Sequence, residues 1–286
     1  MRENPWLDRR VICFAHQGGA MENPSSTLHA IVEAIAHGAT AVELDVHATA
    51  DGHLVVSHDH TLDRTTNITG EIVNHTLAEL SELDNAYWFV PGEDVQRGRS
   101  ADQYPMRGLA PADHRYGIAT LEEVFDATEG VALNLDIKRT APQVPSYERA
   151  LADLIRLRER TEDVIVASFN DTATDRFKEY APEIATSAGT LAVAEFYRAV
   201  RAGEAPSEEL RRHLALQVPA RFHDIVVVDE AFVTAAHANG FAVHPWTIND
   251  REEMRWLCDV GVDGVISDVP SVLAEVLEER GLTWRR

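Results

Sequence analysis

Acidic side chains alternate with apolar ones in a short stretch of the N-terminal region. Glu43 and Asp45 stand between Val42, Leu44 and Val46. Successive side chains of a β-strand point to opposite faces, so a strand here places both carboxylates on one face and the apolar residues on the other. Because buried carboxylates are costly unless cations neutralise them, the pattern predicts a charged functional site inside the fold.

A second stretch repeats this alternation. Asn134, Asp136 and Lys138 share one parity, and apolar residues occupy the positions between them. We expect these side chains to meet Glu43 and Asp45 where parallel strands end, and such oxygen donors favour one divalent metal, Mg²⁺ or Ca²⁺, over zinc. The alternative is a set of buried ion pairs between Lys138 and the acids, although parallel core strands are usually apolar throughout.

Two histidines follow segments that are expected to be strands or hairpin arms. His16 comes directly after the apolar run 11–15, and His58 closes an alternating segment over 53–58. Histidine titrates near neutral pH and can transfer a proton in either direction, so the neighbouring carboxylates favour an acid-base role for this pair. The histidines without such neighbours are expected to be structural or supporting residues: His47, His53, His60, His237 and His244.

The elements that must position these residues alternate along the chain. Apolar runs are separated by amphipathic segments, which is typical of β-α units in a parallel sheet. Strands are expected at 11–15, 40–47, 131–138, 164–168, 183–187, either 214–219 or 225–228, 241–247 and 264–267. Helices are expected at 26–37, 77–83, 121–128, 146–160, 171–180, 191–202, 230–239, 251–260 and 270–280. Eight strands in 286 residues predict an α/β fold, a single (β/α)8 TIM barrel domain over 1–286.

Residues 85–117 break this alternation. The segment is rich in Gly, Pro, Arg and Asp and separates two expected helices. We interpret it as a small insertion after the second strand region that lies over the barrel mouth. A disordered loop is the alternative, but the aromatic content of the segment disfavours it. These aromatic residues are Tyr87, Trp88, Phe89, Tyr104 and Tyr116.

Composition limits the partners of the protein. A formal net charge of −21 argues against binding to nucleic acid and to anionic bilayers. A small anionic substrate is compatible with this charge if a metal and a few cations invert the field locally. Cys13 and Cys258 are too few for a disulfide framework or a zinc site.

The sequence also bears on location. No segment approaches the ~20 apolar residues that a membrane span requires, so we expect no stable membrane insertion. Residues 1–10 are charged and lack the apolar core of a signal peptide, which predicts a cytoplasmic protein. The sequence leaves a homo-oligomer open.

Several motifs, in this order and spacing, make the chain resemble the glycerophosphodiester phosphodiesterase family. The N-terminal ones are His16-Gln17-Gly18, Pro24-Ser25-Ser26-Thr27-Leu28, the run over 38–46, Asp51-Gly52, His58-Asp59-His60 with 61–67, and Thr120-Leu121-Glu122-Glu123. The C-terminal ones are 236–240, Trp246-Thr247-Ile248-Asn249 and 261–268. The resemblance covers nearly the whole chain except 85–117.

The resemblance implies an activity and a set of site residues. The implied reaction is metal-dependent hydrolysis of a small-molecule glycerophosphodiester to sn-glycerol 3-phosphate and an alcohol. The implied ligands of one divalent metal are Glu43, Asp45 and Asp136. His16 and His58 are implied as the catalytic acid-base pair, and the implied substrate-binding residues are Gln17, Lys138 and Trp246.

Three positions depart from the family pattern. Gln17 stands where an arginine is usual, and Ser25 stands where a glutamate is usual. If these two were partners, losing both is a concerted neutral replacement, which we treat as a hypothesis. Asp136 stands where a glutamate is commoner, and it shortens the ligand by one methylene group.

Two other functions compete with this one. A lysophospholipase D of the same barrel type is favoured if Tyr87, Trp88 and Phe89 form an apolar groove. A catalytically silent barrel that binds phosphodiesters is suggested by Gln17 and Ser25. The joint presence of the histidines, the carboxylates and Lys138 argues against the silent barrel.

Overall fold

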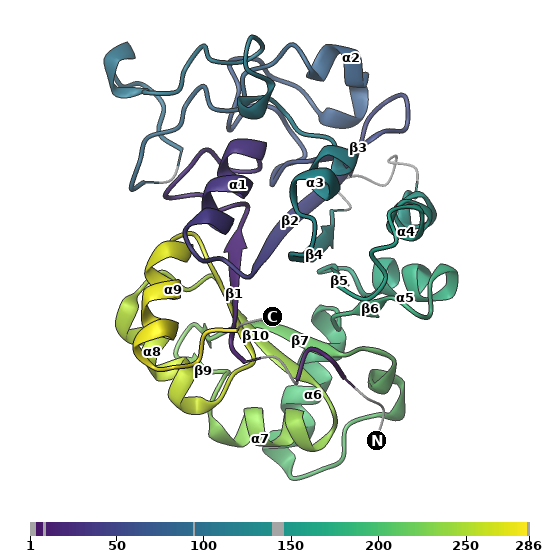
Figure 1. Cartoon of the computed structure of the whole chain (residues 1–286). Coiled ribbons are helices and arrows are strands. Elements are labelled where there is room, and N and C mark those ends of the chain that lie inside the picture. The colour runs from purple at the N-terminus through teal and green to yellow at the C-terminus, as the bar shows by residue number, and fades with distance from the viewer. Residues whose placement is uncertain (1–3, 8–9, 94, 139–145, 285–286) are drawn as a thin grey trace.

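A curled parallel sheet of six strands is the centre of this mixed α/β protein (Figure 1). The computed structural model describes residues 4–7, 10–93, 95–138 and 146–284. The strand order is β11-β1-β2-β4-β5-β6, and a short antiparallel strand, β3 (Leu54–Val56), pairs with β2. The strands of the sheet are β1 (Ile12–His16), β2 (Ala41–Ala48), β4 (Ala132–Ile137), β5 (Val164–Ala167), β6 (Ala185–Thr186) and β11 (Gly264–Ser267).

Two further strands form a separate parallel pair, β7 (Ala215–Pro219) with β10 (Ala242–Trp246). A single bridge between Ser187 and Ala215 joins this pair to the end of β6. On the other side, the N–H of Ile248 donates to the carbonyl of Ile266. Parallel strands therefore occur at all eight expected places, but one continuous eight-stranded ladder is not formed. The two-residue β6 is too short to carry the pairing onward to β7.

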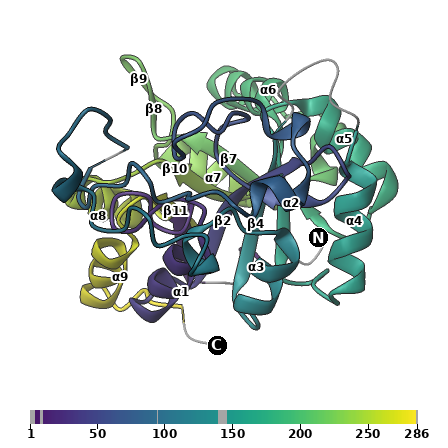
Figure 2. The same cartoon turned by 90° about the horizontal axis from the view of Figure 1, so that it is seen from above.

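The ambiguity between 214–219 and 225–228 is resolved in favour of the first segment. The second contributes β9 (Ile225–Val226), which forms a two-stranded hairpin with β8 (Arg221–Phe222). This hairpin projects away from the strands when the molecule is viewed from above (Figure 2). The alternating segment 53–58 supplies β3, as a hairpin arm against β2.

The helices surround the strands (Figure 2). They are α1 (Leu28–Ala36), α2 (Leu77–Leu80), α3 (Leu121–Ala127), α4 (Glu148–Leu157), α5 (Asp171–Tyr180), α6 (Thr190–Ala202), α7 (Glu230–Ala238), α8 (Arg251–Val260) and α9 (Pro270–Glu279). α3 illustrates how the sequence starts them, because Thr120 and Glu123 form a reciprocal capping box at its N-terminus. No helix of the described ranges is long and apolar enough to cross a membrane.

The apolar parity of β2 faces these helices. Val42, Leu44 and Val46 are fully buried in a core shared with α3, α4 and α5. The same alternation holds on β4, so the polar residues of both strands are directed to the opposite face of the sheet. The parity prediction is therefore confirmed for the apolar half of each strand.

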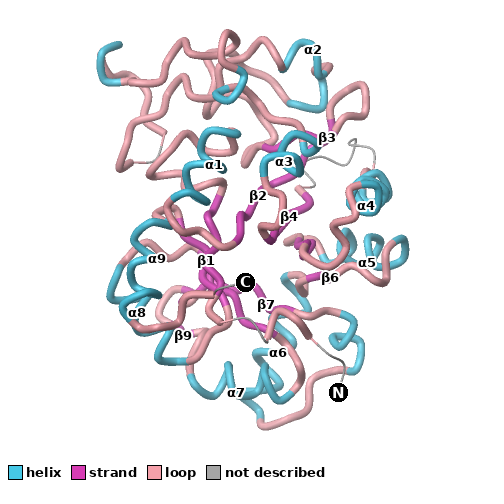
Figure 3. Tube along the Cα trace, viewed as in Figure 1, coloured by secondary structure: helices cyan, strands magenta, loops and turns pink. Residues whose placement is uncertain are grey.

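Residues 57–117, apart from residue 94, form an irregular segment that we call the excursion. It occupies the top of the molecule in Figure 1, and Figure 3 shows that loops dominate it. Its regular turns are α2 and the 3-10 helices η1 (Ile72–Asn74), η2 (Ala101–Gln103) and η3 (His114–Tyr116). A small apolar core holds it together, formed by Val55, Leu62, Ile72, Leu80 and Ile118.

The aromatic residues of the excursion pack around a cation. The guanidinium carbon of Arg107 lies 4.2 Å from the ring centre of Tyr87, 4.6 Å from that of Trp88 and 3.8 Å from that of Tyr104. These contacts order the segment, as its aromatic content predicts. The assignment of 1–286 to one domain, with 85–117 inserted, stays a prediction.

Gly264 of β11 is a point where the fold tolerates no side chain. A Cβ there would lie 2.7 Å from Cε2 of Phe14 and 3.0 Å from Cδ2 of His244, and both neighbours are buried. We expect Gly264→Ala to lower the free energy of unfolding by about 1–3 kcal/mol through overpacking. Urea denaturation followed by circular dichroism measures this change, and an unchanged midpoint would show that the core relaxes freely.

Candidate functional site

A cavity of about 360 Å³ opens among the carboxyl ends of the strands. One wall is polar and includes His16, Glu43, Asp45, His58, Asn134, Asp136, Lys138 and Gln217. The lining also contains largely apolar residues, which we call the apolar wall: Phe169, Val193, Pro219, Phe222 and Trp246. All predicted site residues line this one cavity except Gln17. Sequence positions separated by up to 230 residues are thus brought to a single site.

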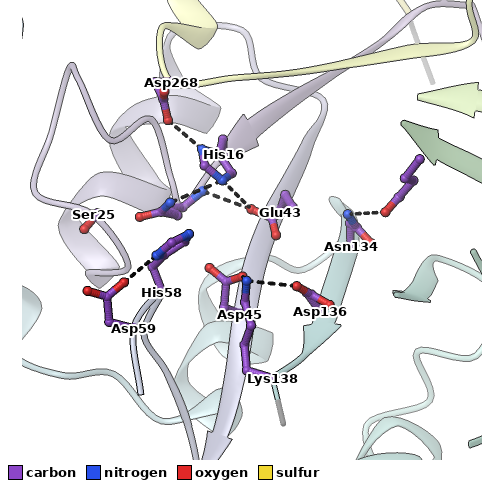
Figure 4. A network of polar contacts seen from close by, with 12 residues as sticks. His16, Ser25, Glu43, Asp45, His58, Asp59, Asn134, Asp136, Lys138 and Asp268 are labelled. Atoms are coloured by element: carbon purple, nitrogen blue, oxygen red, sulfur yellow. Dashed lines mark hydrogen bonds and ion pairs between the residues drawn. The ribbon is translucent and has the colours of Figure 1, made fainter. Parts of the chain in front are cut away.

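His16 is held between two carboxylates at the end of β1 (Figure 4). Its Nδ1 lies 2.6 Å from Oδ1 of Asp268, and its Nε2 lies 3.7 Å from Oε2 of Glu43. Burial by itself would lower the pKa of His16, but Glu43 and Asp268 outweigh burial and raise the pKa to about 9. Asp268 directly follows β11, and its role was not predicted from the sequence.

His58 has a similar carboxylate partner. Its Nδ1 lies 2.6 Å from Oδ1 of Asp59, and this hydrogen bond helps to lower the pKa of Asp59 (Figure 4). The imidazole rings of His16 and His58 are 6.1 Å apart between centroids and nearly perpendicular, at 86°. Both histidines therefore use Nδ1 for a carboxylate, an arrangement that fixes the ring and suits acid-base chemistry at Nε2.

Three carboxylates are buried next to each other on the floor of the cavity. Asp45 of β2 and Asp136 of β4 are direct partners in the sheet register, and Glu43 is two residues before Asp45. Burial, reinforced by Asp45, raises the pKa of Glu43 to about 8. Burial also raises the pKa of Asp136. The cluster is therefore short of positive charge.

Lys138 supplies part of that charge. Its Nζ lies 2.8 Å from Oδ1 of Asp45 and 3.1 Å from Oδ2 of Asp136 (Figure 4). These carboxylates raise the pKa of Lys138 although burial opposes them. The lysine expected to contact phosphate is thus paired with acids here, and this ion pairing is the alternative that the sequence left open.

The three carboxylates offer only oxygen donors to a metal ion. As they stand, no three His, Cys, Asp or Glu side chains within the described ranges are arranged to hold one. The donor chemistry nevertheless fits, because Oδ2 of Asp45 and Oδ1 of Asp136 are buried and have no hydrogen-bond partner among the described residues. Buried carboxylate oxygens without partners are what a hard cation would neutralise.

Gln17 lies beside the cavity rather than in its lining. Gln17 is only 4% exposed, and its backbone adopts a left-handed conformation with a φ of 53°. Its Oε1 accepts a hydrogen bond of 3.0 Å from Nη2 of Arg64, and Nη2 also donates to Oγ of Ser25 at 3.2 Å. The two unusual residues thus share one guanidinium group, which supports a concerted replacement. Arg64 lies within the motif over 61–67, but no role was predicted for it.

Trp246 was predicted to line the cavity, whereas the other residues of the apolar wall were not. Trp246 ends β10, and Phe169 follows β5, with ring centroids 5.3 Å apart in an edge-to-face contact. Phe169 and Phe222 are each 58% exposed. Tyr87, Trp88 and Phe89 do not line the cavity, and the first two pack on Arg107, so the groove that would favour a lysophospholipase D is not formed there.

The fold and the site together define a class: an α/β protein with an acidic, histidine-containing centre at the carboxyl ends of its parallel strands, where such folds place active sites. The model of the glycerophosphoryl diester phosphodiesterase family matches residues 16–272. The chain belongs to this family.

Individual relatives agree with the family match. A glycerophosphodiester phosphodiesterase of Caldanaerobacter subterraneus subsp. tengcongensis is 31% identical over 277 residues, which cover 95% of this chain and 100% of the relative. Two solved structures are similar in fold. The glycerophosphoryl diester phosphodiesterase domain of a Mycobacterium tuberculosis protein has a TM-score of 0.76, 18% identity and coverage of 94% and 99%. An Oleispira antarctica phosphodiesterase in complex with the product sn-glycerol-3-phosphate has a TM-score of 0.70, 25% identity and coverage of 95% and 98%.

Proposed function

We propose that this chain hydrolyses glycerophosphodiesters to sn-glycerol 3-phosphate and an alcohol. One observation carries the proposal: two histidines, each with a carboxylate on Nδ1, line the same cavity as three buried carboxylates and a lysine. Membership of the family supports the proposal. The product bound to the Oleispira antarctica relative gives the chemical class of the substrate.

His16 and His58 are the proposed acid and base. One histidine removes a proton from the nucleophile, and the other protonates the departing alkoxide. Asp268 and Asp59 hold the two rings in place through Nδ1. The nucleophile is either water, or the 2-hydroxyl group of the substrate glycerol, which would release the alcohol and form a cyclic phosphate that water then opens to glycerol 3-phosphate.

Glu43, Asp45 and Asp136 are the proposed ligands of one divalent metal, Mg²⁺ or Ca²⁺. When bound, the ion supplies Lewis-acid chemistry and neutralises phosphate charge. The unpartnered oxygens of Asp45 and Asp136 support this assignment. Lys138 competes for the same carboxylates, so we propose that it exchanges them for the substrate phosphate. Trp246 belongs to the apolar wall of the same cavity.

The barrel is also part of the proposal. We propose that the six-stranded sheet and the β7–β10 pair together make up the (β/α)8 barrel, and the bridge between Ser187 and Ala215 supports this. The cytoplasmic location, the lack of nucleic-acid partners and any homo-oligomer stay predictions.

A lysophospholipase D is the second candidate. Phe169, Phe222 and Trp246 line one side of the cavity, and the first two expose much of their surface. Such a wall can contact the acyl chain of a lysophospholipid. A silent binding protein is less favoured, because both histidines and all three carboxylates face the cavity.

Product analysis separates these candidates. We expect purified protein to release sn-glycerol 3-phosphate from glycerophosphocholine and glycerophosphoethanolamine, measured by a coupled enzymatic assay. A lysophosphatidylcholine is assayed in parallel for release of lysophosphatidate. Lysophosphatidate as the dominant product would favour the second candidate, whereas binding without any turnover would favour the silent protein.

A further inference from the structure

Arg64 stands between the two histidines without lining the cavity. Its Nη2 donates to Oε1 of Gln17, whose Nε2 lies 3.2 Å from Nε2 of His16. Its Nε lies 3.5 Å from Oδ2 of Asp59, whose Oδ1 is the partner of His58. A chain of five side chains therefore runs from one histidine to the other, with Arg64 in the middle.

The guanidinium group is chemically suited to this place. It has five donors in a planar fork and no acceptor, so its contact with Gln17 fixes the amide with the oxygen toward Arg64 and the nitrogen toward His16. The third contact, to Oγ of Ser25, fixes the position of the same Nη2. The side chain of Arg64 is 21% exposed, so water screens these contacts only in part.

The link matters because the two histidines come from different elements. His16 ends β1 in the sheet, whereas His58 and Arg64 belong to the excursion. Outside this chain of contacts, each histidine is oriented by its own neighbours. A rotation of either ring changes the distance between acid and base, and a misplacement of about 1 Å can lower a rate by ~10²-fold.

We propose that Arg64 is a positioning residue that fixes His16 and His58 relative to each other. In this proposal, the side-chain oxygens of Gln17 and Ser25 accept the hydrogen bonds that hold the guanidinium group of Arg64. The proposal rests on the proposed function, since it concerns the same acid-base pair. Arg64 acts through Gln17 and Asp59, and it is not among the residues that line the cavity.

The test compares steady-state kinetics of the full chain carrying Arg64→Ala, with glycerophosphocholine as substrate and circular dichroism and thermal midpoint as folding checks. We expect kcat to fall by ~10- to 100-fold while KM changes by less than about threefold, because orientation is lost and not binding. The kcat of Arg64→Lys is expected to fall by a similar factor, since a single ammonium group cannot replace the planar set of donors of the guanidinium group. The matched control is Arg280→Ala, which removes a guanidinium of similar exposure, 29%, from its pair with Asp259 on the outer helices.

Added guanidinium ion gives a readout that a purely structural role would not produce. At millimolar concentration it is expected to raise kcat of Arg64→Ala and to leave Arg280→Ala and the parent protein unchanged. If Arg64→Ala does not fold, Gln17→Asn tests the same chain, because asparagine tolerates the left-handed backbone but is one methylene too short to span both neighbours. A kcat loss without a KM change is expected there too.

Three results would overturn the proposal: an unchanged kcat in the folded Arg64→Ala and Gln17→Asn variants, full recovery in Arg64→Lys, or a rise in KM at constant kcat. The last would mean that Arg64 binds substrate directly. All rates are compared with the parent protein on the same substrate. Absence of turnover by the parent protein would contradict the proposed function, whereas parent turnover with an unaffected Arg64→Ala variant would contradict only the role of Arg64.

Discussion

Replacing either histidine of the cavity with alanine is expected to reduce turnover of a glycerophosphodiester by ~10²-fold or more. His16→Ala removes the group between Asp268 and Glu43, and His58→Ala removes the group held by Asp59. Each change deletes one proposed proton-transfer group and leaves the carboxylates that are proposed to bind metal in place. The measurement is kcat for release of sn-glycerol 3-phosphate, with the thermal midpoint recorded for each variant.

A nearby histidine provides the control. His60 is exposed and does not line the cavity, so His60→Ala should keep the parent rate. His16→Gln serves as a second variant, because it retains polar atoms next to the two acids if alanine disturbs folding. Parent-like rates in both alanine variants would remove the acid-base assignment, whatever the carboxylates bind.

Removal of divalent metal by EDTA is expected to lower kcat by ~10³-fold or more, because several kcal/mol of charge stabilisation disappear. Addition of Mg²⁺ or Ca²⁺ is expected to restore turnover. A second readout does not depend on activity. Metal should raise the thermal midpoint, since a ligand present at ~100 times its Kd stabilises the folded state by about 2.7 kcal/mol. Asp45→Asn and Asp136→Asn should each reduce this rise.

The stability of the metal-free protein should depend on pH in a direction that the pKa of Glu43 defines. The pKa of Glu43 is raised from 4.5 to about 8, so the folded protein binds more protons than the unfolded one between these values. Without metal, stability should therefore fall as pH rises from about 4.5 to 8. Metal affinity should increase over the same window, because the ion competes with a proton for the carboxylate.

A buried acid elsewhere serves as the control for the metal experiment. Asp263 pairs with His237 away from the cavity, and burial raises its pKa as well. Asp263→Asn should keep the full metal-induced rise of the midpoint. A midpoint that does not respond to metal in the parent protein would leave Lys138 as the resident cation of the cluster and contradict the metal assignment.

The positions of the carboxylates could be predicted because strand periodicity leaves only two faces. Once Leu44 and Val46 are assigned to the helix-covered face, Asp45 has only the other face available. The same parity placed Asp136 and Lys138 at the cavity, and the end of an apolar run placed His16 there. Such inferences are local, and they depend on geometry that every β-strand shares.

What could not be predicted depends on contacts between distant loops. Arg64 meets Gln17 across 47 positions, and Asp268 meets His16 across 252. No local pattern specifies either contact, because the conformations of the loops are set by tertiary packing. Phe169 and Phe222 of the apolar wall were missed for the same reason, since they lie after β5 and in the short strand β8 rather than in the aromatic excursion. The two-residue length of β6 likewise could not be read from an apolar run over 183–187.

The excursion has a small apolar core of its own, which bears on how the candidate site loses its geometry on heating. His58 and Arg64 belong to the segment that is built around this core, whereas His16 and the carboxylates belong to the sheet. Segments with few buried contacts open more often than the rest of a protein. If the excursion opens separately from the sheet, we expect heating to separate His58 from His16 before the secondary structure of the sheet is lost.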